Sequence, residues 1–292
     1  MAQPGTTPVA SELTREEKAE IRPNFPARFW RKQLILPAEH GAWSWWIVPF
    51  LVGLALVRPW RLALLPAALV ALCLFLLRQP ITVFLRVRRG RARPTDGPPA
   101  LAWLTILLLG LAAGVIWLVL LQRAILWRLL PVVGLLGLLY LLAILRRASA
   151  VRTLWLQLVG AGGLAVTAPL AITAANGRLG PWEWGLWAVM AGLNMLGVLY
   201  VRVRIADTHT RSADRRLMLL GHLAACLLVG VAGIEGWIPG LVAPAYLALL
   251  ARALWLFRTA RPVANVRRFG LGEVGVELLC GLWIVISYGA AI

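Results

Sequence analysis

Apolar residues form long runs along almost the whole chain, separated by short segments that contain charged residues, proline or glycine. A helix that crosses a bilayer needs roughly 20 mostly apolar residues, and the runs have about this length. The pattern therefore predicts an all-α, polytopic membrane bundle of about nine transmembrane helices. The predicted spans are residues 42–57, 60–77, 101–121, 125–145, 154–174, 183–201, 217–235, 238–256 and 271–290.

The first 34 residues differ from this pattern. They are polar, and acidic and basic side chains are mixed in the stretch SELTREEKAE. Such a segment has too few apolar residues to form a core of its own. We therefore expect residues 1–34 to be a cytoplasmic N-terminal tail, partly disordered, and residues 35–292 to form a single transmembrane helical domain.

The composition also indicates a membrane protein, since 60% of the residues are hydrophobic and only 14% are charged. The net charge of +18 would suggest nucleic acid binding in a soluble protein. With the N-terminus inside, however, 25 of the 30 Lys and Arg residues fall in inner segments, as the positive-inside rule expects. The charge therefore predicts a membrane protein with a cytoplasmic N-terminus and an outer C-terminus, and no nucleic acid partner.

Polar side chains within apolar spans are costly in a membrane and are therefore candidates for function. Those near the ends of the predicted spans gather on the cytoplasmic side, although they are spread over nearly 240 residues of sequence. This asymmetry predicts one polar cavity open to the cytoplasm. Its candidate residues are Glu39, His40, Arg78, Gln79, Tyr200, Arg202, Arg204, Glu273 and Glu277.

Three candidates also have a structural interpretation. Glu39 and His40 can cap the first helix, because an acid near a helix N-terminus meets the positive end of the helix dipole. Asn194, near the middle of the sixth span, can form an interhelical hydrogen bond or contact a ligand. The three histidines of the chain do not follow a spacing typical of zinc sites, so we expect no metal site, and no motif identifies a cofactor.

Glu273 and Glu277 are four residues apart and so lie on one face of the ninth predicted helix, where like charges repel. A shared proton, a bound ligand or a cationic partner would relieve this repulsion. If the partner is cationic, we expect it to be Arg78 or Arg202. The structural alternative is a neutral Glu277 packed in the interior.

Three short segments carry a family resemblance: PAEHGAW at residues 37–43, RQP at 78–80 and LYVRVRI at 199–205. In these segments the chain resembles the YwiC-like family of bacterial integral membrane proteins, and the resemblance covers most of the chain. The resemblance implies a multi-pass protein of the bacterial plasma (inner) membrane, and it implies no particular activity.

In architecture the predicted bundle is also similar to intramembrane prenyltransferases of the UbiA type. In that superfamily, aspartate-rich motifs in the loops after spans two and six hold an isoprenoid diphosphate through magnesium. Here the first loop, residues 78–93, has no carboxylate, and the second has only Asp207 and Asp214, so the usual magnesium site is not expected. Arginines, which can bind phosphate directly, stand in these loops instead: Arg78, Arg202 and Arg204.

These observations lead to a hypothesis about function, in which the protein binds or transfers an isoprenoid or another anionic lipid in the cytoplasm-facing cavity. Proton acceptors in a transfer reaction would be Glu39, His40 and Glu273. The ligand contacts would come from Arg78, Gln79, Asn194, Tyr200, Arg202, Arg204 and Glu277. Two alternatives stay open: a small-solute transporter, for which broken helices and a site near the bilayer midplane are typical, and a noncatalytic accessory of a respiratory or envelope complex.

Overall fold

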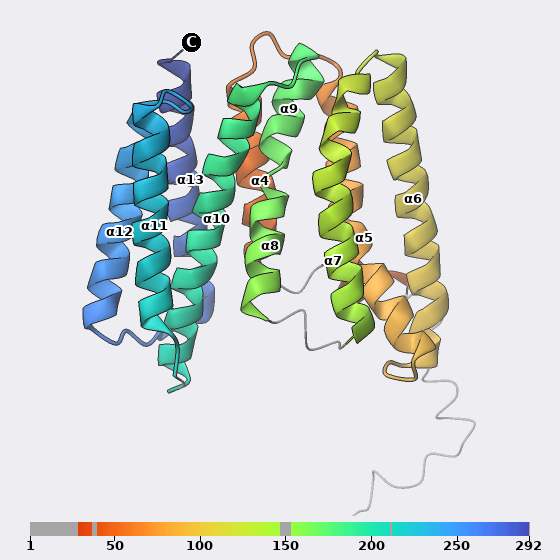
Figure 1. Ribbon diagram of the computed structural model, residues 1–292. Coiled ribbons are helices and arrows are strands. Elements are labelled where there is room, and N and C mark those ends of the chain that lie inside the picture. The colour runs from red at the N-terminus through yellow and green to blue at the C-terminus, as the bar shows by residue number, and fades with distance from the viewer. Residues whose placement is uncertain (1–28, 37–39, 147–152, 211, 292) are drawn as a thin grey trace, which may run out of the picture. The chain divides into compact units, whose positions relative to one another are not determined.

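The computed structural model describes residues 29–36, 40–146, 153–210 and 212–291 (Figure 1). All of these residues are in helices or in the loops between them, with no strand, so the predicted all-α class is confirmed. They divide into two compact units. Unit 1 contains residues 29–36 and Leu76–Leu108, and unit 2 contains residues 40–75 and 109–291.

Each predicted span corresponds to helical structure, which confirms a multi-pass bundle. Eight helical segments of the described chain are long and apolar enough to cross a membrane, and the first predicted span corresponds to a shorter apolar helix of 16 residues. The helices are α3 (Lys32–Ile35), α4 (His40–Ala55), α5 (Leu64–Arg88), α6 (Gly97–Leu120), α7 (Leu130–Arg146), α8 (Leu154–Leu164), α9 (Thr167–Asn176), α10 (Pro181–Thr208), α11 (Arg215–Ile234), α12 (Ala243–Arg258) and α13 (Val266–Gly289).

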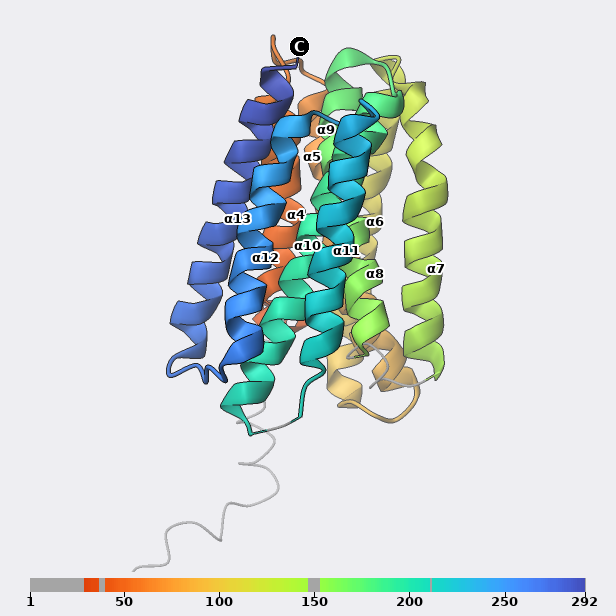
Figure 2. The ribbon, with the colours of Figure 1, turned by 60° about the vertical axis from the view of Figure 1, so that its left-hand side comes forward.

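In unit 2, α10 lies between the pair α8 and α9 and the group α11, α12 and α13, while α4 packs along α8, α9 and α13 (Figures 1 and 2). Small residues let α4 and α9 approach closely. A Cβ atom at Gly53 would lie only 2.4 Å from the Ala168 carbonyl oxygen, so a larger residue would separate the two helices. Lipid tails are as apolar as leucine, so close packing and interhelical hydrogen bonds must hold such a bundle together.

The fifth predicted span is interrupted, because α8 ends at Leu164 and α9 begins at Thr167. Pro169 lies in the first turn of α9, where its missing N–H is tolerated. The last four carbonyl groups of α8 have no partner within that helix, but each has one elsewhere. They accept from Asn194 Nδ2 at Ala161 (2.9 Å), Trp187 Nε1 at Gly162 (3.1 Å), Val166 N at Gly163 (3.0 Å) and Thr167 Oγ1 at Leu164 (3.0 Å).

A second proline, Pro49, interrupts the hydrogen bonds within α4. Because proline has no N–H, the carbonyl group of Trp45, four residues earlier, loses its helical donor. Asn194 Nδ2 donates to this carbonyl over 3.1 Å, in addition to Ala161. A single buried amide on α10 therefore completes the backbone hydrogen bonding of both α4 and α8.

Replacing Asn194 in the presence and absence of Pro49 tests this pairing as a thermodynamic cycle. We expect Asn194→Leu to lower the free energy of unfolding in detergent by about 1 kcal/mol, as for other interhelical hydrogen bonds in membranes. In the Pro49→Ala background the loss should be about half as large, since the alanine restores an N–H donor for Trp45.

As a control, Thr105→Val removes a hydroxyl that bonds only within its own helix, to the Leu101 carbonyl, and should change the unfolding free energy little. Equal losses for Asn194→Leu in the two backgrounds would contradict the proposed role of Pro49.

Candidate functional site

Arginines are concentrated at one end of unit 2, where α10 and α12 end and α11 and α13 begin. We call this the basic end of unit 2. Its described basic residues are Arg202, Arg204, Arg215, Arg216, Arg252, Arg258, Arg261, Arg267 and Arg268. Three acids lie near them in the sequence: Asp207, Asp214 and Glu273. The contacts of these acids decide which arginines stay without a carboxylate partner.

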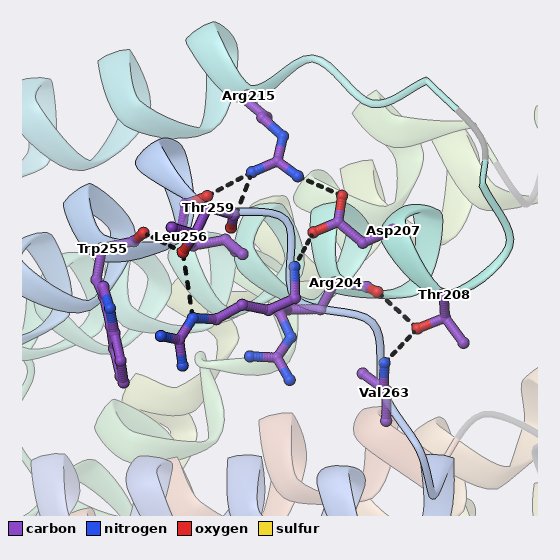
Figure 3. A network of polar contacts seen from close by, with 9 residues as sticks. Arg204, Asp207, Thr208, Arg215, Trp255, Leu256, Thr259 and Val263 are labelled. Atoms are coloured by element: carbon purple, nitrogen blue, oxygen red, sulfur yellow. Dashed lines mark hydrogen bonds and ion pairs between the residues drawn. The ribbon is translucent and has the colours of Figure 1, made fainter.

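Asp207, at the end of α10, uses both of its carboxylate oxygens (Figure 3). Oδ1 accepts from Arg215 Nη2, and Oδ2 accepts from the backbone N–H of Arg261 over 3.0 Å. Arg215 also donates to the carbonyl groups of Leu256 and Thr259 at the end of α12. These contacts connect the ends of three helices, and we call them the loop clasp.

Thr208 extends the loop clasp by one residue. Its hydroxyl donates to the Arg204 carbonyl over 2.9 Å and accepts from the Val263 N–H over 2.8 Å (Figure 3). The guanidinium of Arg261 lies over the Trp255 ring, 3.3 Å from its centroid. The segment between α12 and α13 is thereby fixed against the end of α10.

Glu273 pairs with Arg252, which is on α12. Arg252 Nη1 lies 3.0 Å from Oε1 and 2.9 Å from Oε2 of Glu273, and each side chain is about one-fifth exposed (18% and 19%). The guanidinium of Arg252 also covers the ring of Tyr200, 3.8 Å from its centroid. Our expectation of Arg202 as the partner was therefore wrong.

Arg252 was not among the candidates from the sequence. A signal for it was present, because Arg252 is the single charge within the predicted span 238–256, and isolated intramembrane charges are paired. Sequence spacing alone could not show that α12 brings this arginine to the face of α13.

Glu277 and His222 are buried polar residues close to this ion pair. Glu277 is 7% exposed, and its Oε1 has no hydrogen-bond partner among the described residues, while Ser44 lies within hydrogen-bonding reach of the carboxyl group. The Nδ1 of His222 lies 2.8 Å from the Met218 carbonyl oxygen, so Nδ1 carries the hydrogen. These residues, with Arg252 and Glu273, bring polar groups from α4, α11, α12 and α13 into the interior of unit 2.

Arg204 shares a buried Nε without a hydrogen-bond partner with Arg252, but differs from Arg215 and Arg252 because no hydrogen bond joins it to a carboxylate among the described residues. Its guanidinium lies over the ring of Phe269, 5.0 Å from the centroid, and its Nε is buried without a hydrogen-bond partner in the part of the chain that the structure describes. Glu273 is close enough to interact with its charge. Arg202, two residues earlier, is exposed and donates to Gln157 over 3.4 Å. Arg204 is thus held in place by an aromatic ring, with donor capacity left for a ligand.

The other candidates lie elsewhere. Glu39 is outside the described residues, and His40 begins α4. Gln79 belongs to unit 1, where its Nε2 donates to the Gln33 carbonyl over 2.7 Å, and Arg78 precedes it in α5. Asn194 makes interhelical hydrogen bonds to backbone carbonyl groups.

Five candidates from the sequence are therefore brought together at the basic end of unit 2 or just inside it: Tyr200, Arg202, Arg204, Glu273 and Glu277. No group of three or more His, Cys, Asp or Glu residues that could hold a metal is found among the described residues. The arrangement can bind an anion through guanidinium groups.

Part of the chain matches the model of a known family. Residues 36–172, a little under half of the chain, match the family model described as YwiC-like protein. The predicted resemblance is confirmed over this range, which includes PAEHGAW and RQP from residue 37 onward, whereas LYVRVRI lies outside it. Neither curated proteins nor solved structures give a match, so the similarity to UbiA-type enzymes stays a prediction.

Removing one member of the Arg252–Glu273 pair should destabilise unit 2, because the other charge would be left without its partner in the bundle. We expect Arg252→Met or Glu273→Met alone to cost about 2 kcal/mol, below the roughly 3–5 kcal/mol of a fully buried pair, because these side chains are partly exposed. The double substitution should recover most of this loss. The stability of the three variants is compared through the melting midpoint of each purified protein in detergent.

Arg258→Met, at the exposed end of the same helix, is the control and should leave the midpoint nearly unchanged. A double variant as unstable as the sum of the two single variants would show that the pair is not the source of the stabilisation.

Proposed function

We propose that this multi-pass membrane protein of YwiC-like type binds an anionic lipid at the basic end of unit 2, with Arg204 as the main contact to the lipid phosphate. The observation that carries this proposal is the Arg204 side chain, whose buried Nε has no hydrogen-bond partner among the described residues and which, unlike Arg252, makes no ion pair with a carboxylate among them. The proposal keeps the anionic lipid expected from the sequence and selects Arg204 from the three candidate arginines.

The electrostatics of the basic end support a phosphate at Arg204. The nearby acids are already engaged, since Asp207 is bound by Arg215 and Arg261, and both oxygens of Glu273 are bound by Arg252. A planar guanidinium offers a fork of N–H donors that matches two phosphate oxygens. The Phe269 ring restrains Arg204 from one side, so less side-chain entropy is lost when an anion binds.

The surroundings favour a lipid over a soluble anion. Exposed arginines at the same end, Arg267 and Arg268, add a general attraction to an anionic membrane surface. Exposed leucines on α13, such as Leu271 and Leu279, provide an apolar surface for acyl chains beside these arginines.

Binding is proposed rather than transfer of the lipid. A general base must have an oxygen available for the proton that it accepts, whereas both oxygens of Glu273 are held by Arg252. Transport is less well supported, although the interruption between α8 and α9 is of the kind found in transporters. The carbonyl groups that this interruption frees in α8 are bound by side chains and backbone of the protein itself.

We further propose that the basic end faces the cytoplasm of a bacterial cell and that the protein resides in the plasma membrane. The positive-inside distribution of arginine supports this orientation. The lipid would then come from the inner leaflet, where anionic head groups attract basic segments.

Substitution of Arg204 tests the lipid proposal. We expect Arg204→Gln to reduce the retention of phosphatidylglycerol by the purified protein about tenfold, since a charge-assisted hydrogen bond contributes about 1.5–3 kcal/mol. Native mass spectrometry of protein released from nanodiscs of mixed phosphatidylglycerol and phosphatidylcholine measures the retained lipid.

Arg258→Gln is the matched control, because it removes the same charge from the same end of unit 2 at an exposed position. It should lower retention less than twofold. Equal effects of the two substitutions would indicate general attraction to the membrane surface and would refute a site at Arg204.

Reporter fusions test the orientation. A reporter that is active only in the cytoplasm should be active after the loop around Asp214, between α10 and α11, and inactive when fused after the last helix, α13. Activity at both positions would overturn the predicted orientation of the C-terminus.

A further inference from the structure

Unit 1 contains a pocket of about 560 Å³. This volume is in the range of small-molecule sites, roughly 300–1,000 Å³, but most such sites have largely apolar walls. Here all lining residues except one are polar or charged: Arg31, Lys32, Gln33, Ala92, Arg93 and Asp96. The lining therefore favours a strongly polar ligand.

One wall of the pocket is the segment that precedes α4. Trp103 Nε1 donates to the Phe29 carbonyl over 2.9 Å, and the two rings stack with their centroids 4.8 Å apart. Leu34 is buried, and Gln79 Nε2 donates to the Gln33 carbonyl. Contacts to α5 and α6 thus fix the backbone that carries Arg31 and Lys32.

The other wall is the connection between α5 and α6. Gly90 adopts a positive φ of 66° at the end of α5, and the Arg91 N–H returns to the Arg86 carbonyl over 2.8 Å, which closes the helix. Pro94 then disfavours helical backbone at Arg93, which is extended (φ −65°, ψ 129°). The direction of the chain at Arg93 is therefore set by its neighbours.

An ion pair joins the two walls. Arg31 Nη1 lies 3.2 Å from Asp96 Oδ1, although the residues are 65 positions apart in the sequence. Asp96 contacts one nitrogen of Arg31, and among the described residues of the lining it is the only acid, against three basic side chains. The pocket therefore keeps an excess of positive charge.

We infer that this pocket binds a phosphate-bearing anion through Arg31, Lys32 and Arg93. Arginine and lysine are the usual partners of phosphate oxygens, and Asp96 positions Arg31. The adjacent N-terminus of α6, at Gly97, adds the positive end of a helix dipole to the attraction. This site is separate from Arg204 and does not depend on the proposed function.

Either a free phosphate compound or a lipid head group can supply this chemistry. We therefore use two probes on the full-length protein. The first is inorganic phosphate, measured by titration calorimetry of the Arg204→Gln variant in nanodiscs of phosphatidylcholine alone, so that phosphate at Arg204 does not contribute. The second is phosphatidylglycerol, measured by retention in native mass spectrometry in the Arg204→Gln background, so that lipid held at Arg204 does not contribute.

We expect Arg93→Gln to weaken binding of at least one probe about tenfold, as for loss of a charge-assisted hydrogen bond. Arg91→Gln is the matched control: it removes an exposed arginine two positions away, outside the pocket lining, and should change binding less than twofold. Phosphate binding identifies a free phosphate compound as the ligand, and lipid retention alone identifies a head group.

The inference is overturned if neither probe binds, or if Arg91→Gln weakens binding as much as Arg93→Gln. If Arg93→Gln disturbs the fold, Lys32→Gln is the second test variant. It changes another exposed side chain of the lining and should also weaken binding. Because phosphate binding is measured independently of Arg204, a negative result for the pocket in unit 1 does not contradict the proposed lipid site. A negative result for the lipid site at Arg204 likewise does not contradict the pocket.

Discussion

The need of every backbone carbonyl group for a donor is the constraint on which unit 2 depends. Hydrocarbon offers no water, so each unsatisfied backbone group costs several kcal/mol. Pro49 removes the donor of Trp45, and the end of α8 frees four further carbonyl groups. The side-chain amide of Asn194 donates to the carbonyl group of Trp45 and to one of the four carbonyl groups of α8, that of Ala161. A polar residue deep in the bundle is thus required by the backbone of its neighbours.

Charge at the basic end follows a related logic. Two partly buried carboxylates at this end pair with arginines, Asp207 with Arg215 and Glu273 with Arg252. Because arginines outnumber acids at this end, some guanidinium groups stay without a carboxylate. Arg204 is the one held by an aromatic ring with a buried, unpartnered nitrogen. The positive-inside rule places arginines in the cytoplasmic loops, and the same arginines can therefore form an anion-binding site.

The sequence predicted the helices well and their partners poorly, for a physical reason. A membrane demands apolar length of each helix whatever its neighbours are, so hydropathy alone was sufficient to find the nine helical runs. Hydropathy could not show that α12 faces α13, and the partner of Glu273 was therefore missed. It also could not distinguish a kink at Pro169 from a new helix start, because proline is compatible with both. The glutamates and arginines could be identified as candidate site residues from the sequence, because a charged side chain inside a membrane costs free energy however the helices pack.

The hydrogen bond between Asn194 and Trp45 has a consequence for biogenesis. Residues emerge from the ribosome in order, and Asn194 follows Trp45 by 149 positions. Helix α4 has 16 residues and a length of about 24 Å, short for a bilayer core of roughly 30 Å. Among the described membrane helices α4 is synthesised first, and its backbone hydrogen bonds are completed only when α10 has been made. The nascent chain must therefore carry α4 with an unsatisfied carbonyl group until α10 is synthesised.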